Sequence, residues 1–210
     1  MLNINKFKNI SFLKFLILFT AYIFFINYIF LYKGVFSGFL QNNQLSFSIF
    51  FFLIFAIVFI LVFASIFCIL FLPFSLKPVA IILILASGIS AYFMQAYGVI
   101  IDKDMLLNVL HTDTKEAFSY FSIGLIFWII FTTILPCVYV LFVKINYGSF
   151  KNELKSRVKI ISFSIVAIAI IFSLTPKIFI PFFREHSNLR TVLLPYYPIY
   201  SATKLVKSLT

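Results

Sequence analysis

Residues 47–72 read FSIFFFLIFAIVFILVFASIFCILFL, a run without a single charged side chain. A bilayer core about 30 Å thick is crossed by roughly 20 apolar residues, because each helical residue adds about 1.5 Å. The run is therefore long enough to span a membrane. Its backbone must then be helical, since lipid offers no partner for unpaired N–H and C=O groups. This stretch predicts an integral membrane protein.

The composition of the whole chain supports that prediction. Of the 210 residues, 63% are hydrophobic and 11% are charged, and the mean hydropathy is +1.11. Soluble domains carry about 25% charged residues to cover their surface, so a water-facing exterior is excluded for most of this chain. The net charge of +11 is distributed over the gaps between apolar runs, which favours membrane topology over nucleic-acid binding.

Four further apolar runs predict additional spans. The expected fold is an all-α bundle of five transmembrane helices over residues 15–32, 47–72, 78–97, 122–143 and 158–175. Pro78 suits the first turn of the third helix, and Pro176 closes the fifth. Residues 1–176 are thus the expected membrane domain, with an extracytoplasmic loop over 98–121 that holds a short interfacial helix. Residues 177–210 are the expected linker on the outer side, which lies at the membrane interface.

Lysine and arginine residues determine the predicted orientation, because those in short loops stay on the cytoplasmic side. The loops on the outer side hold only Lys33, Lys103 and Lys115 before the last span. The inner segments hold Lys6, Lys8, Lys14, Lys77, Lys144, Lys151, Lys155, Arg157 and Lys159. We therefore expect the N-terminus on the cytoplasmic side of the membrane and the C-terminus on the outer side. The basic residues after Pro176 oppose this arrangement.

The sequence offers few groups for metal or redox chemistry. Cys68 and Cys137 lie inside apolar runs without CxxC spacing, so neither a disulfide nor a metal pair is expected. His111 has acidic neighbours in the outer loop but no second histidine at helical spacing. No metal ligand is therefore predicted.

The loop over residues 98–121 holds four of the six acidic residues of the chain. Asp104 is expected to cap the short helix there. Four apolar residues would form one stripe on that helix and face the membrane interface; they are Met105, Leu106, Val109 and Leu110.

Three polar residues of this loop are spaced by four positions: Asn108, Thr112 and Glu116. On a continuous helix they would form one polar row. Thr112 could also begin a new helical turn, because capping residues and acids follow it. An amide, a hydroxyl and a carboxylate in a row suit a zwitterionic lipid headgroup with an ammonium group. The alternative is that the row is only the solvated face of an interfacial helix.

The order of residues in two segments resembles a known family. The first segment has Tyr92-Phe93-Met94 and Tyr97 to Asp102, then Met105, Asn108, Thr112-Asp113 and Glu116-Ala117; the second has Phe182-Phe183-Arg184, Leu189-Arg190 and Pro195 to Ser201. Together they resemble the membrane domain and the start of the linker in the lipid A phosphoethanolamine transferases. That family includes the transferable colistin-resistance enzymes, so lipopolysaccharide modification and polymyxin resistance are implied.

The resemblance implies transfer of phosphoethanolamine from phosphatidylethanolamine to lipid A or another envelope acceptor. In the family a threonine nucleophile acts beside zinc in a periplasmic catalytic domain. The resemblance therefore implies a bacterial inner membrane as the location, with the N-terminus in the cytoplasm and the C-terminus in the periplasm. The resemblance also implies that Asn108, Thr112 and Glu116 line the lipid-donor headgroup site, with Glu116 placed to meet the ammonium group. The chain ends at Thr210, where the catalytic domain would follow. We therefore expect no catalytic residue and no cofactor in this chain, and zinc in the missing domain.

The expected function is the membrane-anchoring, lipid-donor-facing domain of a phosphoethanolamine transferase, not catalytic by itself. Membrane lipids, phosphatidylethanolamine first, and a separately encoded or truncated catalytic domain are the expected partners; nucleic acid is not. The alternative is a small non-enzymatic membrane protein, such as a transporter or channel subunit, or a lipid-binding partner of another enzyme. Transport is disfavoured because no charged residue lies near the middle of a span.

Overall fold

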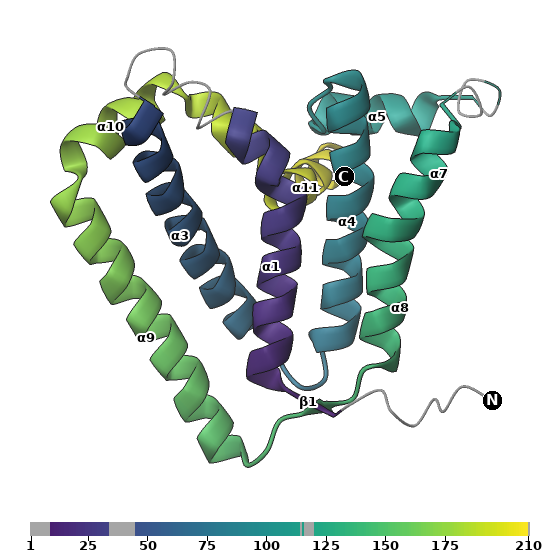
Figure 1. Ribbon diagram of the computed structural model, residues 1–210. Helices are drawn as coiled ribbons and strands as arrows, with labels where there is room; N and C mark the ends of the chain where they lie inside the picture. Colours follow the sequence, from purple (N-terminus) through teal and green to yellow (C-terminus); the bar gives the residue numbers. More distant parts are fainter. Residues whose placement is uncertain (1–8, 34–44, 114, 116–119, 210) are drawn as a thin grey trace. The chain divides into compact units, whose positions relative to one another are not determined.

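The computed structural model describes residues 9–33, 45–113, 115 and 120–209, and these are mainly helical (Figure 1). Five helical segments are long and apolar enough to cross a membrane: Phe12–Leu31, Ser48–Leu70, Leu76–Tyr97, Ile123–Phe142 and Phe150–Leu174. The prediction of an all-α fold with five transmembrane helices is confirmed. The chain is a multi-pass membrane protein.

The bounds of the fifth span differ from the predicted ones. Helix α9 runs over Phe150–Leu174, so it begins about two turns before the predicted start. Its first turns carry charged residues, so a hydropathy pattern does not assign them to a span. These turns are nevertheless helical, and within them Glu153 and Arg157 form an i,i+4 ion pair. The predicted end is right, because Pro176 already begins the next helix, α10 (Pro176–Glu185).

The tail after the last span is helical. It consists of α10, the 3-10 helix η4 (Ser187–Val192) and α11 (Tyr196–Leu209). Helices α10 and α11 are amphipathic.

The helices form two compact units. One comprises Met1–Val79 and Leu141–Ser187, and the other Ala80–Val140 and Asn188–Thr210. The first contains β1 (Ile10–Ser11), α1 (Phe12–Leu31), α3 (Leu45–Leu70), β2 (Ile145–Asn146), α9 and α10. The second contains most of α4 (Leu76–Tyr97), then α5 (Lys103–His111), α7 (Ile123–Ile129), the π-helical turn η3 (Ile130–Ile134), most of α8 (Leu135–Phe142) and α11.

The core of the first unit is a ladder of phenylalanine rings between α1 and α3. The Phe19 ring meets the Phe67 and Phe71 rings edge-on, with centroids 4.9 Å apart in each pair. Phe67 and Phe71 stack on each other at 5.3 Å. Edge-to-face and offset pairs of this kind contribute about 0.5–1.5 kcal/mol each beyond the area that they bury. The phenylalanine side chains of α1 and α3 therefore stabilise the packing of these two helices.

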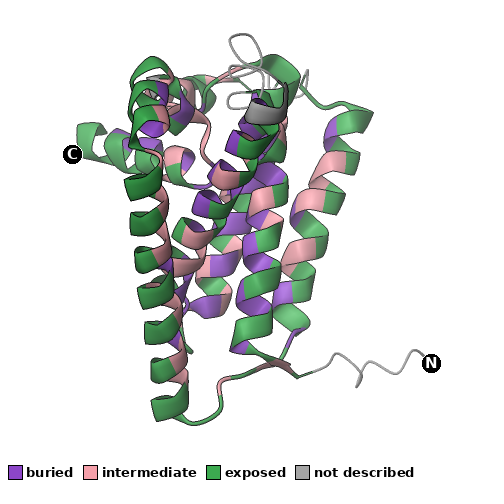
Figure 2. Cartoon of the chain, turned by 60° about the vertical axis from the view of Figure 1, so that its left-hand side comes forward, coloured by how far each residue is buried: buried purple, intermediate pink, exposed green. Residues whose placement is uncertain are grey.

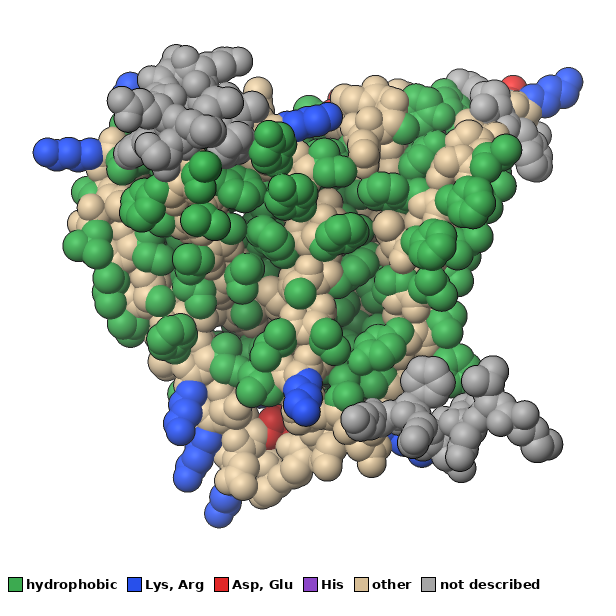
Figure 3. Space-filling model, viewed as in Figure 1, with side chains coloured by type: hydrophobic (Ala, Val, Ile, Leu, Met, Phe, Trp, Pro, Cys, Tyr) green, Lys and Arg blue, Asp and Glu red, His purple; other side chains and the backbone are tan. Residues whose placement is uncertain are grey.

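Helix α9 packs along α3 but leaves much of its apolar surface uncovered (Figure 2). Helix α10 turns back at Thr175 and packs on the other end of α3, where the Phe51 ring lies 5.0 Å from both Phe179 and Phe182. On the face seen in Figure 3, hydrophobic side chains cover the middle of the helices and basic side chains lie at their ends. This distribution suits a lipid environment.

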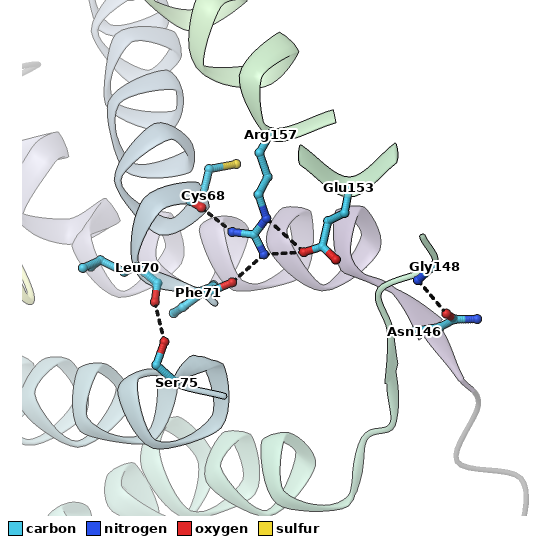
Figure 4. Close-up of polar contacts among 8 residues, drawn as sticks. All are labelled: Cys68, Leu70, Phe71, Ser75, Asn146, Gly148, Glu153 and Arg157. Carbon is cyan, nitrogen blue, oxygen red and sulfur yellow. Dashed lines mark hydrogen bonds and ion pairs between the residues drawn. The ribbon is translucent and has the colours of Figure 1, made fainter. Parts of the chain in front are cut away.

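Arg157 is buried at one end of the first unit (Figure 4). Its guanidinium donates to the backbone carbonyls of Cys68 and Phe71 at the C-terminus of α3. It also pairs with Glu153, with Nε and Nη2 lying 2.9 and 2.6 Å from Oε1. The guanidinium carbon lies 3.9 Å from the centroid of the Phe12 ring. Arg157 thus joins α1, α3 and α9, whereas the sequence pattern predicts only an inner-loop cation at this position.

Two further connections link segments of the first unit that are far apart in the sequence. Strands β1 and β2 pair in parallel, and Ile10 N donates to Lys144 O at 3.0 Å. Lys77 Nζ donates to Leu141 O at 2.8 Å, near the C-terminus of α8. Two cations of this unit therefore satisfy carbonyl groups at helix C-termini, where the helix dipole favours positive charge.

Helix α4 lies close to the middle of the fourth span in the second unit. The Trp128 indole donates to Gly88 O at 2.9 Å. A π-helical turn follows at Ile130–Ile134, in which Leu135 N donates to Ile130 O, five residues back. Pro136 explains this turn, because it has no N–H and its ring would clash with the carbonyl four residues earlier.

Candidate lipid-headgroup site

The predicted site loop begins where α4 ends. Gly98 has a φ of +67° and its N–H donates to Met94 O at 3.1 Å. This left-handed conformation favours glycine and ends the helix at Tyr97. The chain then runs through Ile101, which is buried, to the start of α5.

Asp102, not Asp104, caps α5. The Asp102 carboxylate accepts a hydrogen bond from Met105 N at 2.8 Å, and its backbone is extended. Asp104 lies in the first turn, where its charge is favoured by the helix dipole. The predicted cap was wrong by two residues because both aspartates precede the apolar stripe, and only the backbone conformation separates them.

We expect Asp102→Ala to loosen α5 locally by about 1 kcal/mol, because the first-turn N–H groups lose their acceptor. Hydrogen exchange of the α5 amides checks this, and exchange should become about fivefold faster. Asp104→Ala is the matched control, and its smaller effect of about 0.3–1 kcal/mol reflects the dipole alone. Equal protection in both variants would contradict the assignment of the cap.

The apolar stripe of α5 is only partly covered. Met105 and Leu106 are half-buried, while Val109 and Leu110 are 57% and 65% exposed. Helix α5 packs against α11, which belongs to the same unit. No residue of α5 is fully buried, so its remaining apolar surface suits contact with lipid.

The structure places two of the three predicted site residues next to each other. Asn108 lies on the last turn of α5 and is exposed. Thr112 directly follows the helix, and its hydroxyl donates to the Asn108 carbonyl at 2.8 Å. Since that bond uses the hydroxyl proton, the Thr112 oxygen faces any ligand as an acceptor.

The continuous helical row predicted from the spacing is wrong at Thr112. Helix α5 ends at His111, and Thr112 is extended, with φ −66° and ψ 129°. The run Thr112-Asp113-Thr114 is the sequence signal, because short polar side chains compete for backbone hydrogen bonds. Glu116 lies outside the described residues. The choice of Asn108, Thr112 and Glu116 as site residues stays a prediction.

Aromatic rings cluster beside this loop. We call them the aromatic cluster: Tyr92, Phe93, Tyr97, Tyr120 and Trp128. The Tyr97 and Tyr120 rings are almost perpendicular, at 87°, with centroids 5.5 Å apart. Tyr92 Oη lies 2.8 Å from Ser122 Oγ, which itself caps α7 by accepting from Leu125 N. The cluster therefore joins the end of α4 to the start of α7.

The charge of this loop is opposite to that of the chain. Residues 97–121 contain four acidic residues and two lysines, a net charge of 2 − 4 = −2, within a chain of net charge +11. The carbonyl end of α5 adds partial negative charge at Thr112. The arrangement attracts cations.

The described residues contain no cluster of metal-ligating side chains. In the ranges that the structure covers, no three His, Cys, Asp or Glu side chains lie close enough to hold one. The zinc that the resemblance implies is expected in a separate domain.

Comparison with known proteins identifies the family. The model of the phosphoethanolamine transferase EptA/EptB family matches residues 58–209, which is more than half of the chain. The chain belongs to the phosphoethanolamine transferase EptA/EptB family. This match contains the loop with Asn108 and Thr112, the aromatic cluster and the whole tail.

Several members of the EptA/EptB family are similar in sequence. Phosphatidylethanolamine transferase Mcr-1 of Escherichia coli is 35% identical over 130 residues, which are 62% of this chain and 24% of that protein. Phosphoethanolamine transferase EptA of Escherichia coli K12 is 25% identical over 122 residues, 57% of this chain and 22% of that protein. The chain therefore matches about a quarter of the length of these relatives.

A solved structure of an EptA protein has the same fold. The integral membrane protein lipooligosaccharide phosphoethanolamine transferase A from Neisseria meningitidis superposes with a TM-score of 0.85 and 22% sequence identity. The match covers 96% of this chain and 37% of that one. At this identity the likeness establishes the fold of the membrane domain.

Proposed function

We propose that this chain binds the lipid donor of a phosphoethanolamine transferase at the membrane. The donor is phosphatidylethanolamine, and its headgroup is held at the carbonyl end of α5. The observation that carries the proposal is the Thr112–Asn108 hydrogen bond. It places a hydroxyl acceptor and an exposed amide together in the net negative loop.

The chemistry of the headgroup explains why these residues suit it. An ethanolamine ammonium group has three N–H donors and a positive charge, so it requires acceptors. The Thr112 oxygen, the Asn108 carboxamide oxygen and the Glu116 carboxylate are acceptors, and the Asn108 NH₂ group is a donor for the phosphate. A charge-assisted bond from the ammonium to Glu116 would be the strongest contact.

The proposed function also includes a membrane location and a partner domain. The five spans anchor the protein in a bacterial inner membrane, with a cytoplasmic N-terminus and a periplasmic C-terminus. The phosphoethanolamine group is transferred to lipid A or another envelope acceptor by a periplasmic zinc-dependent domain that works with this one. This assignment is supported by family membership and by the names of the relatives.

Headgroup binding can be tested with single alanine substitutions in the full chain. We expect Asn108→Ala, Thr112→Ala and Glu116→Ala each to weaken binding of dihexanoyl phosphatidylethanolamine about tenfold, the effect of roughly 1.4 kcal/mol for a lost hydrogen bond to a charged group. The fluorescence of Trp128, the single tryptophan of the chain, reports the titration in detergent.

Thr175→Ala is the matched control for Thr112→Ala. Its hydroxyl donates to the carbonyl of Ile171, also four residues back, and it is also half-buried. Unchanged affinity in this control and in all three site variants would refute the proposed headgroup site.

A further inference from the structure

The aromatic cluster is the strongest feature that the proposed headgroup residues leave unexplained. Aromatic rings at the end of a span commonly anchor a protein at the membrane surface. Such anchoring requires neither a fixed angle between rings nor an acidic neighbourhood. This cluster has both.

We infer that the aromatic cluster is a subsite for the ammonium group of a zwitterionic phospholipid, with Tyr97 and Tyr120 as its walls. The inference rests on the proposed function, because it adds a second contact to the same headgroup. It names cation–π attraction, rather than hydrogen bonding, as the source of that contact.

The ring geometry is the first argument. Tyr97 and Tyr120 lie at 87° to each other with centroids 5.5 Å apart, so they form two walls of a corner. Tyr97 is 44% exposed and Tyr120 is 37% exposed, which leaves ring surface open to a ligand. A cation within about 6 Å of a ring centroid is attracted by the negative face of the ring.

The support of these rings is the second argument. Phe93 stacks on Tyr97 at 5.7 Å and 24°. Tyr92 contacts both Phe93 and Tyr97 edge-on, and its hydroxyl pairs with Ser122. The corner is thus held by packing and by one hydrogen bond, so a ligand does not have to order it.

Charge is the third argument. In the part of the chain that the structure describes, no lysine or arginine lies over these rings, whereas Arg157 does lie over Phe12. Tyr97 is followed within five residues by the Asp102 cap, and the surrounding loop has net charge −2. An aromatic corner in an acidic loop is complementary to a cation and repels an anionic headgroup.

The test compares three dihexanoyl lipids on the purified full chain in detergent, again through Trp128. Its ring lies 6.4 Å from the Tyr92 ring and so reports on the cluster. Phosphatidylethanolamine and phosphatidylcholine both carry a cation, and phosphatidylglycerol does not. We expect Tyr97→Leu and Tyr120→Leu to weaken binding of the first two about three- to tenfold, within the range of a cation–π contact.

Two sets of controls keep the result specific. Tyr97→Phe and Tyr120→Phe retain the ring and should bind within about twofold of the unaltered chain. Tyr139→Leu removes a tyrosine of similar exposure from α8 and should change nothing. Unaltered binding of both cationic headgroups by the leucine variants would overturn the inference, as would an equal loss for phosphatidylglycerol.

The choice of lipids also separates this inference from the proposed function. Choline has no N–H donor, so loss of the Thr112 or Glu116 acceptor weakens phosphatidylethanolamine selectively, whereas loss of a ring weakens both lipids. Acceptor variants that act while the leucine variants do not would refute the aromatic subsite and leave the proposed headgroup site intact. The reverse result would support the subsite and refute the acceptor residues.

Discussion

Replacing Arg157 by alanine is expected to destabilise the protein by about 3–5 kcal/mol, because it leaves a partner charge and two carbonyl groups without their donor. The Glu153 side chain is only 8% exposed, so its carboxylate cannot regain full hydration. The carbonyls of Cys68 and Phe71 lose their side-chain donor at the end of α3. The Phe12 ring also loses its cation. Thermal unfolding in detergent, followed by circular dichroism, measures the loss.

Lys159→Ala is the matched control, since Lys159 is a cation on the same helix but is exposed. It should change the stability by less than about 0.5 kcal/mol. Arg157→Lys should fall between the two, because lysine retains the charge but lacks the planar fork that reaches several acceptors. If Arg157→Ala unfolds at the same temperature as Lys159→Ala, the buried cluster does not stabilise the first unit.

Replacing Gly88 by alanine is expected to cost about 1–3 kcal/mol, because the new methyl group overpacks a closed interface. A Cβ atom at this position would lie 2.2 Å from Thr133 Oγ1 and 3.3 Å from the backbone oxygen of Thr132. Helix α4 and the π-helical turn would have to separate, and the Trp128–Gly88 hydrogen bond would lengthen. The same unfolding measurement applies.

A double-mutant cycle with Thr133 tests this explanation. The Thr133 hydroxyl is buried and has no hydrogen-bond partner in the described part of the chain, so Thr133→Ala alone should cost little. Gly88→Ala with Thr133→Ala should be more stable than Gly88→Ala alone, with a coupling of about 0.5–3 kcal/mol. Gly124→Ala is the control, since its nearest contact would lie at 3.8 Å. Strict additivity would show that Thr133 is not the obstacle.

The spans could be predicted from the sequence because the requirement is local. Each apolar run must be long enough for the bilayer and must be helical, whatever its neighbours are. Pro176 marked the end of the fifth span for a similarly local reason. The charged first turns of α9 were missed, since a hydropathy pattern reports burial in lipid and not helix formation.

The structure of the loop that holds the candidate site was predicted in part. The loop, its short helix and the apolar stripe follow from local patterns, and the structure contains all three. The cap at Asp102 was missed, and a break at Thr112 was only an alternative to the continuous row, because both depend on backbone angles that several nearby residues could satisfy. The right angle between Tyr97 and Tyr120 could not be predicted at all, since it arises between α4 and a segment more than twenty residues later.

The sequence by itself determined that this is an α-helical membrane protein with a polar, acidic loop after its third span, because lipid solvation and helix length depend on each segment alone. Only the tertiary structure decided what individual residues do within that plan. In the sequence Arg157 indicates only membrane topology, but in the structure its buried side chain caps the C-terminus of α3. Gly88 proves to be a position where α4 closely approaches Thr133. The physical reason is that both roles consist of contacts between helices far apart in the chain, and such contacts leave no periodic pattern in the sequence.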